Sequence, residues 1–146
     1  MSTWTMHSDI LVPMDGSEQS EKALEYAIEN HPEADITVLH AYGVESADVA
    51  QGAVIVMNDE VREAAKEHAE RVFERAREIA GAADYEGELS TAIEEGQPAK
   101  VIPDRAGEFD VVFMGSHGRQ GTDRILLGSV AETVVRRATV PVMVVK

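Results

Sequence analysis

The chain has 146 residues, which suits a single domain, residues 1–146, with one ordinary core. Its hydrophobic content of 44% argues against disorder, and the absence of cysteine excludes disulfides and thiolate chemistry. The net charge of −14 disfavours nucleic acid as a partner, no apolar run approaches the roughly 18 residues of a membrane helix, and no signal peptide is evident. We therefore expect a cytoplasmic protein that binds neither nucleic acid nor membrane.

The first half of the chain predicts two strands and a helix between them. Residues Ser8–Met14 form a short apolar run that predicts a buried strand, followed by the turn dipeptide Asp15-Gly16. Ser17 can cap a helix with regularly spaced apolar residues, which His31-Pro32 ends. The β-branched run Ile36–Ala41 predicts the second strand.

A segment without clear period, Tyr42–Asn58, precedes the longest predicted helix. Loops of this length are often functional, so a lid or dimer contact is one hypothesis, although we favour a simple connector. Residues Asp59–Ala80 carry one apolar stripe and predict a helix with Gly81 as its C-cap. His68 lies on the apolar side, which favours a packed histidine over a ligand.

The next segments predict a polar edge strand, a short helix and a buried strand. Residues Tyr85–Ile93 are partly polar, which is typical of an edge strand. A short helix opens at Glu94–Pro98 and runs to about Ala106, with a kink or early break expected at Pro103. Residues Phe109–Met114 predict the fourth strand.

The chain closes with a helix and a strand. Residues Ser129–Ala138 predict the last helix, and Ser129 and Glu132 have the spacing of a capping box. Val140–Val145 predicts the fifth strand, and Pro141 favours an edge position or a strand start. Strands and helices alternate, so we predict a doubly wound parallel sheet with helices on both faces. A ligand of such a fold binds at the carboxyl ends of the strands, which Asp15, Ala41 and Gly115 reach.

The most informative pattern is Gly115-Ser116-His117-Gly118, followed after nine residues by Gly128-Ser129. Glycines at the end of a strand allow a ligand to approach the backbone, and the free amides at a helix start suit phosphate. From Gly115 to Arg137, four arginines face two acids, so this region is +2 while the rest of the chain is −16. Arg119 and Arg124 could neutralise phosphate, and Asp15 suits a ribose hydroxyl or a hydrated magnesium ion.

Several other functional classes lack their motifs. The sequence contains no P-loop, no G-x-G-x-x-G after the first strand and no G-x-S-x-G elbow. The five histidines lack metal-binding spacing, and no residue is an obvious general base for rapid catalysis. Nucleotide binding is therefore the leading hypothesis. The acidic surface is consistent with a solvated surface adapted to high salt, and less so with a partner-binding role.

These residues resemble the universal stress protein family of the ATP-binding type. The resemblance rests on Gly115-x2-Gly118-x9-Gly128-Ser129, on Ile10–Ser17, on Leu39-His40 and on Val140–Val145. It implies a five-stranded parallel sheet in the order 3-2-1-4-5, of the adenine nucleotide alpha hydrolase-like (Rossmann-like) type. It also implies a homodimer that pairs through Val140–Val145.

Carried over by position, the resemblance implies that Asp15 contacts the adenosine end and that Ala41 offers backbone contacts to adenine. The implied nucleotide-binding residues are Pro13, Met14, Asp15, Ala41, Met114, Gly115, Gly118, Arg119, Gly128, Ser129 and Val130. Met14 is bulkier than the residue often found beside the aspartate, and Ala131 replaces a frequent hydroxyl residue. No catalytic residue and no resident metal site is implied.

Three functions follow from this resemblance. The first is an ATP-binding regulator of stress survival that acts as a homodimer, with ATP bound together with Mg²⁺. The second is a slow ATPase or self-phosphorylating enzyme on the same fold, which the missing base disfavours. The third is a nucleotide-free dimeric interaction scaffold, which the intact glycine pattern disfavours. We expect a nucleotide-binding regulator rather than a rapid enzyme.

Overall fold

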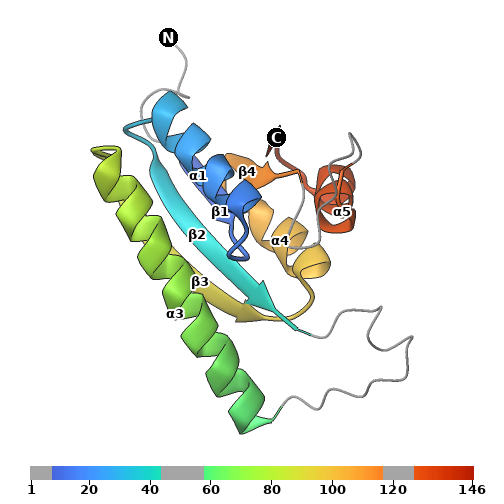
Figure 1. Ribbon diagram of the computed structural model, residues 1–146. Coiled ribbons are helices and arrows are strands. Elements are labelled where there is room, and N and C mark those ends of the chain that lie inside the picture. The colour runs from blue at the N-terminus through green and yellow to red at the C-terminus, as the bar shows by residue number, and fades with distance from the viewer. Residues whose placement is uncertain (1–7, 44–57, 117–126) are drawn as a thin grey trace.

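The computed structural model describes residues 8–43, 58–116 and 127–146 (Figure 1). Five parallel strands form one sheet in the order β3-β2-β1-β4-β5, which confirms the predicted doubly wound arrangement. The strands are β1 (Asp9–Pro13), β2 (Asp35–Tyr42), β3 (Leu89–Glu95), β4 (Val111–Gly115) and β5 (Val142–Val145). In the centre of the sheet, Ile10 of β1 pairs with Ile36 of β2 and with Val111 of β4.

In the described part of the chain, helices cover both faces of the sheet (Figure 1). The helices α1 (Glu18–Asn30) and α3 (Asp59–Ala82) pack on one face, and α4 (Pro98–Ala106) and α5 (Ser129–Arg137) pack on the other. Because side chains alternate along a strand, Ile10 and Val12 enter the first core while Leu11 enters the second. The two outer strands are less buried, and the polar β3 lies at an edge as predicted.

The first helix begins as the sequence predicts. The Ser17 side chain accepts a hydrogen bond from the Ser20 amide at 3.2 Å, which caps α1. The preceding turn requires Gly16, whose φ of +90° is costly for other residues. His31 ends the helix, and its ring packs edge-on against Phe113 with centroids 5.5 Å apart.

The predicted end of the long helix is wrong. Gly81 lies inside α3, and the residue in the left-handed conformation is Asp84, with φ of 53°. The Tyr85 amide donates to the Ala80 carbonyl and the Asp84 amide to the Gly81 carbonyl, which is the Schellman pattern. Tyr85 is therefore not in β3. Its hydroxyl donates instead to the carbonyls of Ala34 and Glu88.

Two further expectations about helices concern α4 and α5. The end of α4 at Ala106 is as predicted, but the early break at Pro103 is wrong, because the helix continues past this proline. Gly128 occupies the N-cap position of the last helix, so Ser129 is its first helical residue and forms no capping box with Glu132. In the described parts of the chain, no helix is both long and apolar enough to span a bilayer.

Candidate nucleotide site at the carboxyl edge of the sheet

The predicted ligand-binding segments lie at one edge of the sheet because all five strands are parallel (Figure 1). Asp15 follows β1, Ala41 is the second-last residue of β2, and Ser116 follows β4. The helix α5 starts at Ser129, close to the end of β4. This is the edge at which doubly wound folds bind their ligands.

The end of β4 is joined directly to the start of α5. The Gly128 amide donates to the Ser116 carbonyl at 2.7 Å, and the Ser116 amide donates to the Val145 carbonyl at 3.0 Å. The two halves of the glycine pattern, far apart in sequence, are therefore hydrogen-bonded neighbours. Gly118 and Arg119 fall outside the described residues, as do His117 and Arg124.

The first turn of α5 offers backbone donors. Gly128 is the N-cap with φ −66° and ψ 161°, and no side chain of the described residues caps the helix. The first amide to bond into the helix is that of Glu132, which donates to the Gly128 carbonyl at 2.9 Å. The amides of Ser129, Val130 and Ala131 have no acceptor in the described ranges, so this helix start, where the helix dipole favours an anion, is uncapped there.

Asp15 combines a structural bond with a free acceptor. One carboxylate oxygen, Oδ1, accepts from the Ser17 amide at 2.9 Å, which shapes the turn before α1. The side chain is only partly buried, and Oδ2 has no hydrogen-bond partner among the described residues. A second acceptor is therefore available for a ribose hydroxyl or a hydrated cation.

Three carboxylates near this edge, other than Asp15, are paired with arginines. Glu94 accepts from Arg105 at 2.8 Å, and Glu95 accepts from Arg62 at 2.8 Å. The hydrogen bond from Arg62 holds the pKa of Glu95 below its ordinary value. In α5, Arg136 pairs with Glu132 at 2.8 Å, so the acid in the first helical turn is also compensated. The electrostatic repulsion between this edge and a phosphate is therefore weaker than the net charge of −14 suggests.

Three of the predicted adenosine-side residues lie on the face of the sheet that α4 and α5 cover. Met114 belongs to that core and Ala41 packs against it, while Pro13 is in register with Leu39 of the same core. Val130 packs there as well. Met14 lies on the opposite face, buried in the core formed with α1 and α3, so its bulk does not face Pro13, Ala41 and Met114.

Gly115 has a packing role that the sequence does not reveal. A Cβ atom at this position would lie 2.8 Å from the carbonyl carbon, the carbonyl oxygen and the Cβ of Gln19 in α1. The glycine is therefore required for the approach of α1 to β4, whatever it contributes to a ligand.

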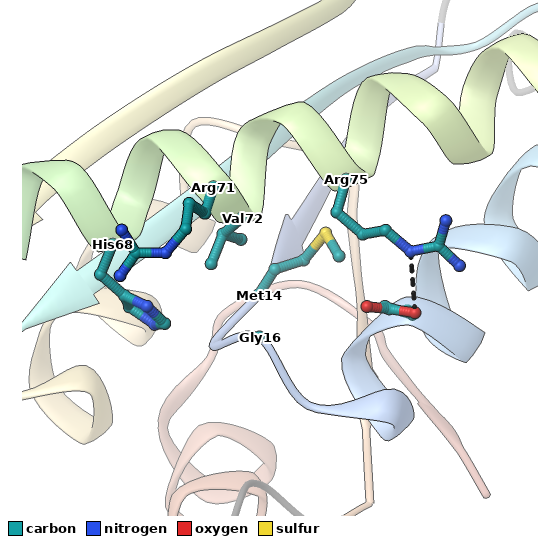
Figure 2. A pocket seen from close by; sticks show the side chains of 7 residues that line it. Met14, Gly16, His68, Arg71, Val72 and Arg75 are labelled. Carbon is teal, nitrogen blue, oxygen red and sulfur yellow. Dashed lines mark hydrogen bonds and ion pairs between the residues drawn. The ribbon is translucent and has the colours of Figure 1, made fainter.

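Sequence reasoning missed a pocket on the face of α1 and α3. His68 packs against another histidine, His40, with ring centroids 5.1 Å apart, as expected for a packed residue. It also lines a pocket with Arg71 and Arg75 (Figure 2). The spacing 68, 71 and 75 along one helix face was the available signal. Among the described residues, no group of three or more histidine, aspartate or glutamate side chains is arranged for a metal ion.

Comparisons with known proteins agree with this geometry. A model of the universal stress protein family matches residues 6–146. The universal stress protein MJ0531 of Methanocaldococcus jannaschii is 33% identical over 147 residues, covering 97% of this chain and 83% of that protein. YxiE of Bacillus subtilis is 32% identical over 150 residues, covering 97% of this chain and all of that protein. The solved structure of MJ0577 superposes with a TM-score of 0.77 at 29% identity, covering 97% and 96% of the two chains.

Some proteins of similar fold have been solved with adenine nucleotides. They include a universal stress protein from Archaeoglobus fulgidus with dAMP, at 22% identity and a TM-score of 0.63 over 97% of this chain and 99% of that one. An Arabidopsis thaliana family member carries AMP, at 16% identity and a TM-score of 0.64 over 95% and 91%. Another carries cAMP, at 22% identity and a TM-score of 0.64 over 95% and 96%. By the extent of the family match and by these relatives, the chain belongs to the universal stress protein family.

Proposed function

We propose that this protein binds ATP with Mg²⁺ at the carboxyl edge of its sheet and acts as a cytoplasmic, homodimeric, nucleotide-dependent regulator of stress survival. The family membership supports the general role. The binding of AMP, dAMP and cAMP by proteins of the same fold supports an adenine nucleotide as the ligand. The regulatory role then consists of a change in shape or partner affinity on nucleotide binding.

The observation that carries the proposal is the hydrogen bond from the Gly128 amide to the Ser116 carbonyl. This bond fixes the uncapped start of α5 against the end of β4, so the amides of the first helical turn are preorganised donors. A phosphate group needs such donors, and a helix start adds about 0.3–1 kcal/mol of electrostatic stabilisation. The Ser129 side chain is exposed and adds a hydroxyl donor at the same point.

The magnesium ion would be held mainly by phosphate oxygens and water. Mg²⁺ in nucleotide sites retains several waters and needs only one or two protein carboxylates. Asp15 has a free carboxylate oxygen at this edge and fits that requirement, or alternatively that of a ribose hydroxyl. The residues present therefore fit a hydrated ion that enters with the nucleotide.

Calorimetric titration of the protein with ATP and with adenosine, both in magnesium, tests the placement of the phosphates. Ser129→Ala removes only the hydroxyl, whereas Ser129→Pro also removes the amide donor. Proline is tolerated at the first helical position, and the ψ of 161° at Gly128 is compatible with a following proline. We expect ATP affinity to fall in both variants and most in Ser129→Pro, by about tenfold or more. Adenosine affinity should stay unchanged.

A second variant, Asp15→Asn, tests the adenosine end. The asparagine side-chain oxygen can still accept from the Ser17 amide, so the turn before α1 is retained. The charge and the second acceptor oxygen are lost, and both ATP and adenosine should bind less tightly. Circular dichroism of the variant checks that the fold is unchanged.

Two results would contradict the proposal. A protein with no measurable affinity for any adenine nucleotide in magnesium would be a nucleotide-free scaffold. An equal loss of ATP and adenosine affinity in Ser129→Pro would mean that the phosphates lie elsewhere. Turnover well above about 1 per second would instead identify an enzyme.

The homodimer is proposed through β5. This strand lies at the edge of the sheet, and its Met143 side chain is 43% exposed. The carbonyls of Pro141 and Val145 face β4, so by alternation the backbone of Val144 faces outward. Val144→Pro removes this outward amide donor, while Val144→Thr retains it. Analytical ultracentrifugation should find a dimer for the parent and Val144→Thr, and a monomer for Val144→Pro.

A further inference from the structure

A pocket lies on the other face of the sheet from Pro13, Ala41 and Met114. Its volume is about 170 Å³, and Met14, Gly16 and Val72 form its apolar part (Figure 2). Ligand pockets for drug-sized molecules occupy about 300–1,000 Å³, so this one is too small for a nucleotide. It suits a small tetrahedral ion.

The polar side of this pocket is basic, which is unusual in a chain with a net charge of −14. His68, Arg71 and Arg75 all come from α3: Figure 2 shows His68 pointing away from the helix axis, Arg71 running along the helix toward His68, and Arg75 turning the other way to Glu21 of α1. The one carboxylate in the lining, Glu21, is engaged by Arg75 at 3.3 Å. The acid in the pocket is thus already compensated.

Arg71 is the available cation. Five other arginines of the described residues form ion pairs with carboxylates: Arg62, Arg75, Arg77, Arg105 and Arg136. Arg71 forms no ion pair with any residue that the structure describes, although Glu67 lies four positions earlier in the helix. A guanidinium group beside a pocket, without a carboxylate partner, is suited to an oxyanion.

The His68 ring, which lines the pocket together with Arg71, is held in place by packing. It packs against His40, and a Cβ atom at Gly16 would lie 3.4 Å from its Cε1. His40 is itself fixed, because its Nδ1–H donates to the Met14 carbonyl at 2.9 Å. The Nε2 atom of His68 is buried without a hydrogen-bond partner in the described part of the protein.

We propose that the pocket between α1 and α3 binds a phosphate group, through the guanidinium of Arg71 and the imidazole of His68. The site is separate from the proposed nucleotide site, since Met14 and Pro13 point to opposite faces of the sheet. The phosphate group comes either from inorganic phosphate or from a small phosphomonoester. This proposal does not depend on nucleotide binding at α5.

Two-dimensional NMR spectra recorded during titration with sodium phosphate, at constant ionic strength, test this proposal. We expect saturable shifts for the amides of residues 14–16 and 68–72, with a dissociation constant of roughly 1 mM or below. Arg71→Gln keeps the length and polarity of the side chain but removes its charge, and should weaken binding by at least about tenfold. Arg77→Gln is the matched control, because Arg77 lies on the same helix, pairs with Glu74 and does not line the pocket.

The same titration with glycerol 3-phosphate distinguishes the two sources of the phosphate group. Tighter binding of this ester assigns the site to phosphomonoesters, and tighter binding of inorganic phosphate assigns it to the free ion. The Ser129→Pro variant distinguishes this site from that at α5, because it should bind phosphate in the pocket as the parent does.

Three results would overturn the proposal. The first is the absence of saturable shifts in residues 14–16 and 68–72. The second is an equal loss of binding in Arg71→Gln and Arg77→Gln, which would indicate a general charge effect. The third is the loss of these shifts in Ser129→Pro, which would locate the phosphate at α5.

Discussion

Gly115 illustrates how one residue in a binding pattern can have a packing role. A side chain at this position would meet the backbone of Gln19, which cannot move without shifting α1. We expect Gly115→Ala to lower the free energy of unfolding by about 1–3 kcal/mol, as overpacking does in other cores. Urea denaturation of the variant measures this change.

Gly107→Ala is the control for this substitution. A Cβ atom at Gly107 would meet only the Thr139 hydroxyl oxygen at 3.7 Å, which is an ordinary contact. Its free energy of unfolding should stay close to that of the parent. Equal stability of Gly115→Ala and the parent would mean that α1 and β4 can separate at little cost. For the same reason, a large residue at Gly115 is unsuitable as a test of phosphate binding.

The hydroxyl of Tyr85 makes the free energy of unfolding depend on pH in the alkaline range. Burial, and then the negative charge of Asp35, raise the pKa of its hydroxyl to about 12, above the 10 of an exposed tyrosine. Because the folded state favours the neutral hydroxyl, its contribution to stability is complete below pH 10 and is lost as the pH rises through 12. The melting temperature should therefore fall more steeply above pH 10 in the parent than in Tyr85→Phe. Identical pH profiles would contradict this prediction.

At this scale, the sequence predicts interactions between residues that are close together in the chain. The cap formed by Ser17 and the turn at Asp15-Gly16 depend on neighbouring residues, and both are present. The contact between Gly115 and Gln19 joins distant parts of the chain, and so does the engagement of Glu95 by Arg62. Such contacts have no local signal, so the sequence alone could not predict them.

At the scale of elements, the end of α3 gives a prediction that separates the sequence-based expectation from the structure. A C-cap glycine would resist replacement by alanine, because alanine is costly in the left-handed conformation. Gly81 is instead helical, and a Cβ atom there would meet no atom within 4 Å. We expect Gly81→Ala to raise the free energy of unfolding by about 0.5–1 kcal/mol, measured by thermal or urea unfolding.

Asp84→Gly tests the same helix end from the other side. Asp84 has the left-handed conformation, with φ of 53°, and glycine adopts it without steric cost. This variant should also be more stable than the parent. If both Gly81→Ala and Asp84→Gly are less stable than the parent, then Gly81 is the residue that caps the helix.

Apolar periodicity predicts the described strands and helices but not their ends. The period of a helix depends on the many residues that face the core, whereas its end depends on a few hydrogen bonds. The composition of residues Tyr85–Ile93 predicts a strand, but the hydroxyl and amide hydrogen bonds of Tyr85 hold it in the turn before β3. The spacing of Ser129 and Glu132 predicts Ser129 as the cap, but Gly128 occupies the N-cap position.

For the whole molecule, alternation of strands and helices predicts the doubly wound class, and the resemblance adds the strand order. The candidate nucleotide site follows from both, since parallel strands collect their carboxyl ends at one edge. The basic pocket does not follow from either. To predict this pocket, one must know which face of the sheet each side chain at the end of β1 occupies. Pro13 and Met14 are neighbours in sequence but lie on opposite faces.

The charge of the whole molecule leads to a prediction about salt. The chain has 27 acidic and 13 basic residues, so many carboxylates have no cationic partner. Exposed ion pairs, such as that of Arg77 and Glu74, each contribute only about 0–1 kcal/mol. Mutual repulsion among the remaining carboxylates should therefore dominate the electrostatic free energy of folding at low salt.

Added salt screens this repulsion, because the Debye length falls from about 10 Å at 0.1 M to about 3 Å at 1 M. We expect the melting temperature to rise over this range by several degrees, on the order of 1 kcal/mol of stability. Glu63→Lys supplies the matched control, because Glu63 is exposed and has Asp59 and Glu67 four positions away on either side in α3. The variant should melt at a higher temperature than the parent in low salt and respond less to added salt. A melting temperature that falls with salt would mean that the ion pairs outweigh the repulsion, and the acidic surface would then need another explanation.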